Sequence, residues 1–470
     1  MRLWFNCVLA ITISLVPAII TLNAHLSSIP IWLTLIIFSY LLLRVVTTRP
    51  YDYLYSAFLC FMYVFMILAP LLQMESGGFP WVDFYTTDTV QLSWWVTATA
   101  LACFELGYIA LRAGMHSAPR PSYFAGLVLS PGGGQVLFLA AMGLCLLGLV
   151  HTGVDKLFLP RNDEARLVSG KIGVQPPPLY TIINALTRVP PVFIMQLFIL
   201  DFFSRINRYP ERPWMTANSY YMVIVGLTVA IINNPISAPR FWVGAIALCG
   251  LLLVLHCQRK VSSMSWFSLN LFILVLAFPI ADMFRNSLDF NPEELQAGPT
   301  RNLVYSPDFD AFQQQMNVIV VTDKIGFQQG KQIASSILFF VPRKIWPQKG
   351  EPTGMMVANE LGYFFNNLSS PLMSEFFIDG GIYAVIAGMF AVGMLYRYLS
   401  MNLLISNPVF VCFYCFFTAY QFYLLRGALM TVTNFLLVGL VACFTIYGFR
   451  RRLFINMPAP NSRGDTLMAN

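Results

Sequence analysis

One polar stretch divides the chain: residues 281–317 are ADMFRNSLDFNPEELQAGPTRNLVYSPDFDAFQQQMN, and residues 337–375 are ILFFVPRKIWPQKGEPTGMMVANELGYFFNNLSSPLMSE. Elsewhere the chain consists of apolar segments joined by short connections. A polar interval of this size, set between apolar segments, indicates a separate functional part. We therefore expect it to cover a site that is embedded in a membrane.

The composition around this stretch is that of a membrane protein. Hydrophobic residues make up 57%, aromatic residues 15% and charged residues 11%, with a mean hydropathy of +0.64. Soluble domains carry roughly 25% charged residues. The apolar runs are continuous rather than alternating, which excludes a transmembrane barrel and favours helices that satisfy their own backbone hydrogen bonds in lipid. The sequence predicts an all-α polytopic membrane protein.

The apolar runs predict about 12 transmembrane helices, at about 3–22, 30–46, 53–73, 91–112, 135–152, 180–203, 218–233, 239–256, 266–283, 376–398, 407–425 and 430–449. Basic residues mark the cytoplasmic side of a membrane protein. In a model with twelve spans they fall on one side: Arg2, Arg44, Arg49, Arg112, Arg120, Arg205, Arg208, Arg212, Arg259, Lys260, Arg397 and Arg450–Arg452. Both termini are therefore predicted to be cytoplasmic. The net charge of +7 is explained without a nucleic acid partner.

This topology divides the chain into four parts. Residues 1–283 hold nine spans and a medium periplasmic loop at 153–179, residues 284–375 form a large periplasmic loop, residues 376–449 hold the last three spans, and 450–470 form a basic cytoplasmic tail. Within the large loop, DFDAFQQQMNVIVV (308–321) and GKQIASSILFFV (330–341) have apolar residues at helical spacing. They predict amphipathic helices that lie on the bundle or in the membrane interface.

Four arginines near the outer ends of spans are not explained by the topology. These are Arg188, Arg240, Arg285 and Arg426. An arginine at membrane depth costs about 2.5–3.5 kcal/mol on insertion scales, so it normally faces a cavity or a partner. Guanidinium groups bind phosphate through paired N–H bonds, so several together predict an anion site. The alternative for each is an arginine that reaches the lipid headgroups.

Further candidates lie in the loops. Arg161 and Arg166 alternate with acidic residues in the medium loop, where they predict either a charged surface helix or a flap that captures an anionic sugar carrier. Glu375 stands at the entry to the tenth span. A carboxylate in apolar surroundings is suited to accept a proton from a hydroxyl group, although at this position it could also stabilise a helix N-terminus. No set of residues predicts a metal site, because Cys412 and Cys415 lack a second pair.

Four motifs resemble a known family. NPISAPRFWVG (234–244), ILFFVPRKIWPQKGEP (337–352), SPLMSEFFIDGGIYAVIAGM (370–389) and LLRG (424–427) are similar to those of the Wzy-type polymerases of bacterial O-antigen and related polysaccharides. The resemblance covers about 233–427 best. It implies an inner-membrane glycosyltransferase of the C-type architecture, with its active site facing the periplasm. It also implies undecaprenyl-pyrophosphate-linked oligosaccharides as donor and acceptor.

The resemblance also implies roles for individual residues. By this analogy Arg240 and Arg426, then Arg285, bind pyrophosphate without metal or cofactor, and Glu375 activates the acceptor hydroxyl. Arg343 is expected to contact sugar or phosphate, and Trp346 to stack on a sugar ring. Besides the bilayer, a chain-length regulator protein remains open as a partner.

Two other functions remain open. An O-antigen ligase has a similar architecture and donor, but ligases are expected to carry a histidine in the large periplasmic loop, and residues 284–375 contain none. A transporter or flippase of lipid-linked oligosaccharides often has twelve spans with both termini inside. A single long loop on one face suits processing on that face better than alternating access, so the polymerase is favoured.

Overall fold

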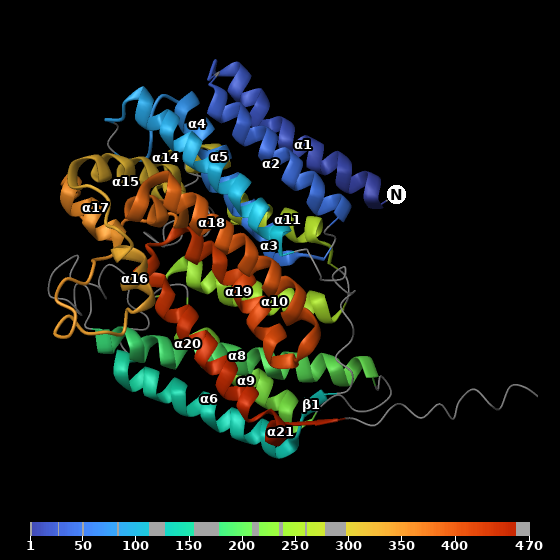
Figure 1. Ribbon diagram of the computed structural model, residues 1–470. Coiled ribbons are helices and arrows are strands. Elements are labelled where there is room, and N and C mark those ends of the chain that lie inside the picture. Colours follow the sequence, from blue (N-terminus) through green and yellow to red (C-terminus); the bar gives the residue numbers. More distant parts are fainter. Residues whose placement is uncertain are drawn as a thin grey trace, which may run out of the picture.

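The computed structural model describes residues 2–26, 28–48, 51–81, 84–111, 127–154, 178–208, 216–234, 238–258, 261–277 and 298–456. These parts are mostly helical, and the long helices run side by side in one bundle (Figure 1). The prediction of an all-α polytopic membrane protein is confirmed in its main feature, since the described residues include ten helices long and apolar enough to cross a membrane.

These ten are α1 (Arg2–Asn23), α2 (Ile29–Thr48), α3 (Tyr53–Phe61) continued through the π-helix η1 (Met62–Leu68) into α4 (Ala69–Glu75), α5 (Thr87–Ala110), α6 (Pro131–Thr152), α8 (Pro178–Arg208), α10 (Arg240–Cys257), α18 (Leu372–Ser406), α19 (Pro408–Arg426) and α20 (Leu429–Gly448). Two shorter apolar helices are α9 (Ala217–Ile232) and α11 (Ser263–Phe272), the latter continued by the π-helix η3 (Ile273–Ala277). Within the described residues, each of the twelve predicted apolar runs forms a helix, the ninth as far as residue 277. The number that spans the membrane stays a prediction.

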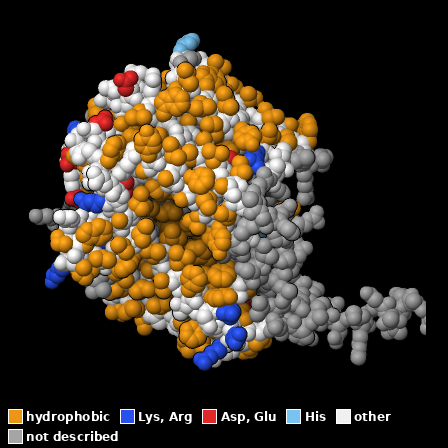
Figure 2. Space-filling model, in the orientation of Figure 1, with side chains coloured by type: hydrophobic (Ala, Val, Ile, Leu, Met, Phe, Trp, Pro, Cys, Tyr) orange, Lys and Arg blue, Asp and Glu red, His pale blue; other side chains and the backbone are white. Residues whose placement is uncertain are grey.

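The bundle has two distinct ends. The start of α1 and the short helix α21 (Arg450–Leu453) lie at one end, which we name the terminal end (Figure 1). The segment 298–371 lies at the opposite end, which we name the loop end. Hydrophobic side chains cover most of the face between the two ends, whereas charged side chains lie mainly towards its margins (Figure 2). This distribution suits a bundle surrounded by lipid.

Glycine allows two long helices to pack closely. A Cβ atom at Gly107 of α5 would stand 1.9 Å from the carbonyl oxygen of Phe390, and one at Gly393 of α18 would stand 2.0 Å from that of Phe104. Small residues at such contacts let helix backbones approach, which is how helices gain van der Waals contact in lipid. The α5–α18 pair is therefore fixed by its glycines.

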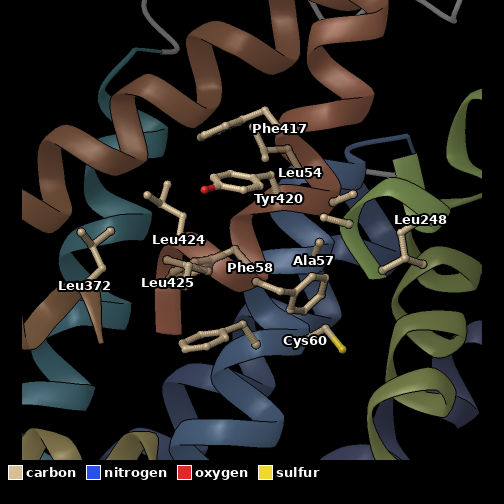
Figure 3. Packing of buried hydrophobic residues seen from close by; sticks show 14 of the residues in the cluster. Leu54, Ala57, Phe58, Cys60, Leu248, Leu372, Phe417, Tyr420, Leu424 and Leu425 are labelled. Carbon is tan, nitrogen blue, oxygen red and sulfur yellow. The ribbon is translucent and has the colours of Figure 1, made fainter. Parts of the chain in front are cut away.

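Helix α19 lies in the centre of the bundle. Its side chains Tyr420 and Leu425 lie close to Leu54 and Phe58 of α3 (Figure 3). A polar contact also joins the two helices: the Tyr414 hydroxyl accepts a hydrogen bond from the Leu54 N–H at 3.0 Å, one of the N–H groups that a helix N-terminus leaves without an intrahelical partner. Because α19 is held on several sides, its last residue is placed rigidly at the loop end.

The loop end is built from short helices: α14 (Gly298–Tyr305), the 3₁₀ turn η4 (Pro307–Phe309), α15 (Ala311–Ile325), α16 (Lys331–Ile337) and α17 (Thr353–Leu361). The helix predicted within residues 308–321 is present as α15, which packs on the bundle and is largely buried among the other helices. Its glutamines find buried partners. The Gln315 side-chain amide donates to the Ser93 carbonyl at 2.7 Å, and Gln313 accepts from the Trp81 N–H at 3.0 Å.

The terminal end contains a small sheet that an all-α prediction missed. Strand β1 (Leu127–Leu129) pairs antiparallel with β2 (Phe454–Asn456), so the first residues of the predicted basic tail are tied to the bundle. Asp201 of α8 accepts from the Leu129 N–H at 2.7 Å and pairs with Arg205 at 2.9 Å. These bonds attach the sheet to α8.

Candidate functional site

A cleft at the loop end brings together two of the predicted arginines. We name it the arginine cleft. It is lined by Pro239, Arg240, Phe241, Asp308, Asn367, Leu368, Ser369, Tyr423, Arg426, Gly427, Ala428 and Thr431. Its cavity volume is about 90 Å³. Since one buried water needs roughly 10–15 Å³ measured in this way, the cleft has room for several waters or a small anion.

The two arginines come from different apolar helices. Arg240 is the first residue of α10, directly after Pro239, and Arg426 is the last residue of α19. The partial positive charge of a helix N-terminus opposes a cation at the first position, so Arg240 does not stand there to stabilise its helix. Its position instead adds a positive charge to a place where the backbone is already positive.

Each arginine is held by an aspartate of the loop end. Arg240 Nη2 lies 2.8 Å from Asp308 Oδ2, and Arg426 Nη2 lies 2.9 Å from Asp310 Oδ1. Arg426 also donates to the carbonyl oxygens of Asp308 and Pro307, at 2.9 and 2.8 Å. The guanidinium carbon of Arg426 lies 5.1 Å from the centre of the Phe241 ring, which adds a cation–π contact. Residues 307–310 therefore cover both cations.

The two aspartates differ in how firmly they are held. Asp310 is 2% exposed and accepts hydrogen bonds from Trp81 Nε1 at 2.8 Å, Ser369 Oγ at 2.8 Å and Gln314 Nε2 at 3.1 Å, in addition to Arg426. The Asp308 side chain is 17% exposed and meets Arg240 at the cleft wall. The Asp310 carboxylate is therefore fixed by several side chains. The more exposed Asp308 carboxylate can more easily give up Arg240 for another partner.

Glu375 supports the cleft without lining it. The side chain is 1% exposed. One carboxylate oxygen accepts from Thr353 Oγ1 at 2.6 Å, at the start of α17, and the other accepts from the Leu429 N–H at 3.0 Å, at the start of α20. Since Ala428 and Thr431 of the α20 start form part of the cleft wall, Glu375 fixes that wall. Its predicted role as a base stays a prediction, and its contacts indicate a positioning role.

Asp379 has a similar structural function one turn further along α18. Its two carboxylate oxygens accept from the N–H groups of Gln332 and Ile333, at 3.0 and 2.9 Å, and so cap the first turn of α16. Helix α18 breaks directly afterwards, at Gly380 and Gly381, where Gly381 has φ +64°. Because L-residues rarely adopt this conformation, glycine is required there. Directly before the break, Asp379 ties the start of α16 to α18.

The segment with Arg343 and Trp346 is folded on itself. Arg343 donates to the carbonyl oxygens of Lys349 and Gly350 at 2.8 and 2.9 Å, and the Lys349 ammonium donates to the Val341 carbonyl at 3.0 Å. Burial, and then the charge of Arg343, lower the pKa of Lys349. Neither Arg343 nor Trp346 belongs to the lining of the arginine cleft. Arg343 here stabilises a loop, and the substrate contacts predicted for both residues stay predictions.

The remaining predicted residues are not part of the cleft either. Arg188 is 6% exposed within α8 and lies outside the lining. Arg161, Arg166 and Arg285 lie outside the described residues. Among the residues that the structure describes, no group of three or more His, Cys, Asp or Glu side chains is placed to hold a metal ion.

Sequence reasoning missed the acidic half of the site. The helical spacing assigns Asp308 and Asp310 to an amphipathic helix, and no pattern marks Asn367 or Ser369, although all four contribute to the site. One signal was present: the sequence SPDFD places two carboxylates just before a helix, in a segment that faces unexplained arginines.

Compared with models of known protein families, with curated proteins and with solved structures, the chain has no match in any of the three.

Proposed function

We propose that this protein is a polysaccharide polymerase, a glycosyltransferase that joins oligosaccharide repeat units carried on a polyprenyl pyrophosphate at the outer face of a bacterial inner membrane. One observation carries the proposal: Arg240 and Arg426, from separate apolar helices, line one cleft at the loop end. Charges in this position are costly in a membrane protein, so their meeting indicates an anionic ligand at the membrane surface. The motif resemblance supplies the substrate class.

The reaction transfers the growing chain from its carrier to a new unit. A hydroxyl oxygen of the acceptor sugar bonds to the anomeric carbon of the donor, the bond from that carbon to the pyrophosphate oxygen breaks, and the hydroxyl proton passes to a base. Negative charge grows on the leaving pyrophosphate. Fixed guanidinium groups stabilise such charge without having to reorganise, and this type of stabilisation contributes strongly to catalysis.

The carboxylate of Asp308 lies where the anion would contact Arg240. It meets Arg240 as one oxygen of a phosphate group would, at 2.8 Å. A pyrophosphate carries more charge and more acceptor oxygens than a carboxylate, so it can replace Asp308 at Arg240. With a volume of about 90 Å³, the cleft suits the phosphate groups, and the oligosaccharide would extend over its mouth.

An O-antigen ligase would use the same donor, and therefore the same cleft. The difference lies in the acceptor, which is a lipid A–core in a ligase and a further repeat unit in a polymerase. A flippase would also have to bind the pyrophosphate, so the arginines do not separate the two functions; the single long polar stretch, which suits processing on one face better than alternating access, favours an enzyme over a transporter.

Deletion of the gene tests the function. The surface polysaccharide of the deletion strain is separated on a gel. Products with a single repeat unit support a polymerase, uncapped core indicates a ligase, and an unchanged ladder rules out the proposal.

Complementation then tests the site. Arg240→Ala and Arg426→Ala should fail to restore long chains at normal protein level, with a loss of about 10²–10³-fold in rate for each. Arg301→Ala is the matched control, because Arg301 is an exposed arginine of the same loop end and lies outside the cleft lining. It should restore the ladder. Full-length chains from both cleft variants would show that the pyrophosphate assignment is wrong.

A further inference from the structure

An aromatic cluster lies beside the arginine cleft and has no role in the reaction above. We name it the aromatic ledge. Trp81 is its centre, with its ring 4.9 Å from that of Phe365, 6.0 Å from Tyr363 and 6.4 Å from Phe364. Tyr85, in the same loop as Trp81, joins it through Asn317, which also bonds to Tyr363, and the Phe84 ring lies 4.8 Å from that of Tyr85. Phe364 is 87% exposed and Phe84 is 44% exposed, so part of the ledge is open at the surface.

The polar groups of the ledge point into the protein. Trp81 Nε1 donates to Asp310 at 2.8 Å, the Tyr85 hydroxyl donates to Asn317 Oδ1 at 2.7 Å, and Asn317 donates to the Tyr363 hydroxyl at 3.0 Å. Aromatic residues that anchor a protein in the membrane interface use these same groups for water and lipid headgroups. Here the groups are already bonded internally. The outer surface of the ledge is therefore formed by the apolar faces of its rings.

The ledge is continuous with the arginine cleft. Asp310 accepts from Trp81 of the ledge and pairs with Arg426 of the cleft, so one carboxylate joins the two. The chain also runs directly from Phe364 and Phe365 to Asn367 and Ser369 of the cleft lining. Three residues span at most about 10 Å, so Phe364 and Asn367 are separated by a distance that an oligosaccharide can bridge.

We infer that the aromatic ledge is a sugar subsite, which binds pyranose rings of the oligosaccharide through their C–H faces. A pyranose ring has an apolar C–H face and a polar hydroxyl edge. The exposed aromatic rings match the apolar face, and the exposed Asn367 amide beside them can bond to hydroxyl groups. The choice of an oligosaccharide rests on the proposed function, whereas the position of the subsite rests on the ring contacts alone.

The test uses oligosaccharides without pyrophosphate, so that binding is separated from catalysis. The full-length protein in lipid nanodiscs is mixed with oligosaccharides released by mild acid from the source cell's own surface polysaccharide. Saturation-transfer NMR then reports which sugar protons contact the protein. Transfer to ring C–H protons is expected, and Phe364→Ala should weaken binding about threefold to tenfold. Phe364 is so exposed that the substitution removes little packing.

Two variants provide the controls. Phe340→Ala removes another exposed phenylalanine of the loop end, which is 54% exposed and outside the ledge, and should bind sugar as the native protein does. Arg240→Ala should also keep sugar binding while losing chain synthesis. If Phe364→Ala binds the sugars unchanged, or only lowers the stability of the protein in the bilayer, the ledge is a membrane anchor and the inference fails. By contrast, an unchanged ladder in the deletion strain would rule out the proposed polymerase function without affecting the measurement of sugar binding.

Discussion

Both ends of the bundle contain buried pairs of arginine and carboxylate, but the two ends are built differently. At the terminal end, Arg44 of α2 pairs with Glu105 of α5, and Glu105 also accepts from the Tyr55 hydroxyl at 2.7 Å. Both partners of this pair stand on long apolar helices. At the loop end, Arg240 and Arg426 stand on long helices, but Asp308 and Asp310 stand on a short connecting segment.

This difference in construction determines how easily each ion pair can open. A pair whose members are both fixed on packed helices can open only if the helices separate. A pair with one member in a short 3₁₀ turn, at the wall of a cleft, can open by a local change. The Arg44–Glu105 pair at the terminal end therefore stabilises the bundle, whereas at the loop end the Arg240–Asp308 pair is the one that can open by a local change.

The largest expected effect concerns the terminal end. Arg44→Ala leaves the Glu105 carboxylate buried without its cation, which typically costs about 3–5 kcal/mol. Thermal unfolding in nanodiscs should show the loss, and the protein level in cells should fall. The chains made by each remaining molecule should keep their length.

The double variant Arg44→Ala/Glu105→Gln is the control for this prediction. It removes the isolated charge, so it should be more stable than Arg44→Ala alone. If Arg44→Ala were as stable as the native protein and lost chain synthesis, the distinction between the two ends would be wrong.

The next effect concerns the support of the cleft wall. Glu375→Gln replaces one of two acceptor oxygens by an NH2 group. The remaining oxygen can still accept from the Leu429 N–H, but the NH2 group can only donate to the Thr353 hydroxyl, whose own proton then loses its acceptor. A buried donor without a partner costs about 1–3 kcal/mol, so unfolding should occur at a lower temperature. Turnover by each folded molecule should fall by less than about tenfold, since the carboxylate does not line the cleft.

Glu360→Gln is the matched control, because Glu360 is an exposed glutamate of the same loop end. It should change neither quantity. A loss of turnover of about 10²–10⁴-fold with unchanged stability would instead establish Glu375 as a general base.

Much of the fold could be predicted because lipid imposes simple rules. A helix that crosses a membrane must be continuous and apolar, so α2, α6 and α20 are visible as apolar runs. The shared end of Arg240 and Arg426 followed from the alternation of basic and non-basic connections. Both predictions depend only on local composition.

The acidic partners could not be predicted, because they depend on distant contacts. Arg426 and Asp310 are separated by 116 positions in the chain, and Gln315 and Ser93 by 222. Helical periodicity places Gln315 on a polar face but does not reveal that this face meets buried acceptors. The loop contacts of Arg343 could not be predicted for another reason: its partners are backbone carbonyls six and seven residues away, and a sequence motif does not show backbone contacts.

The smallest effect tests whether the Arg240–Asp308 pair at the loop end opens. Asp308→Asn removes the negative charge that holds Arg240 and leaves a side chain of similar size. Inorganic pyrophosphate then no longer competes with a carboxylate, so it should bind about threefold to tenfold more tightly, as expected for a partly exposed ion pair. Titration calorimetry of the protein in nanodiscs measures this change.

Asp323→Asn, at an exposed aspartate near the end of α15, should leave binding unchanged. Asp310→Asn should behave differently from both: the buried Asp310 carboxylate holds Trp81, Ser369 and Arg426 in place, so its loss should lower stability instead of raising affinity. Equal or weaker pyrophosphate binding by Asp308→Asn would mean that Asp308 belongs to the binding site itself, and the loop end would then be as fixed as the terminal end.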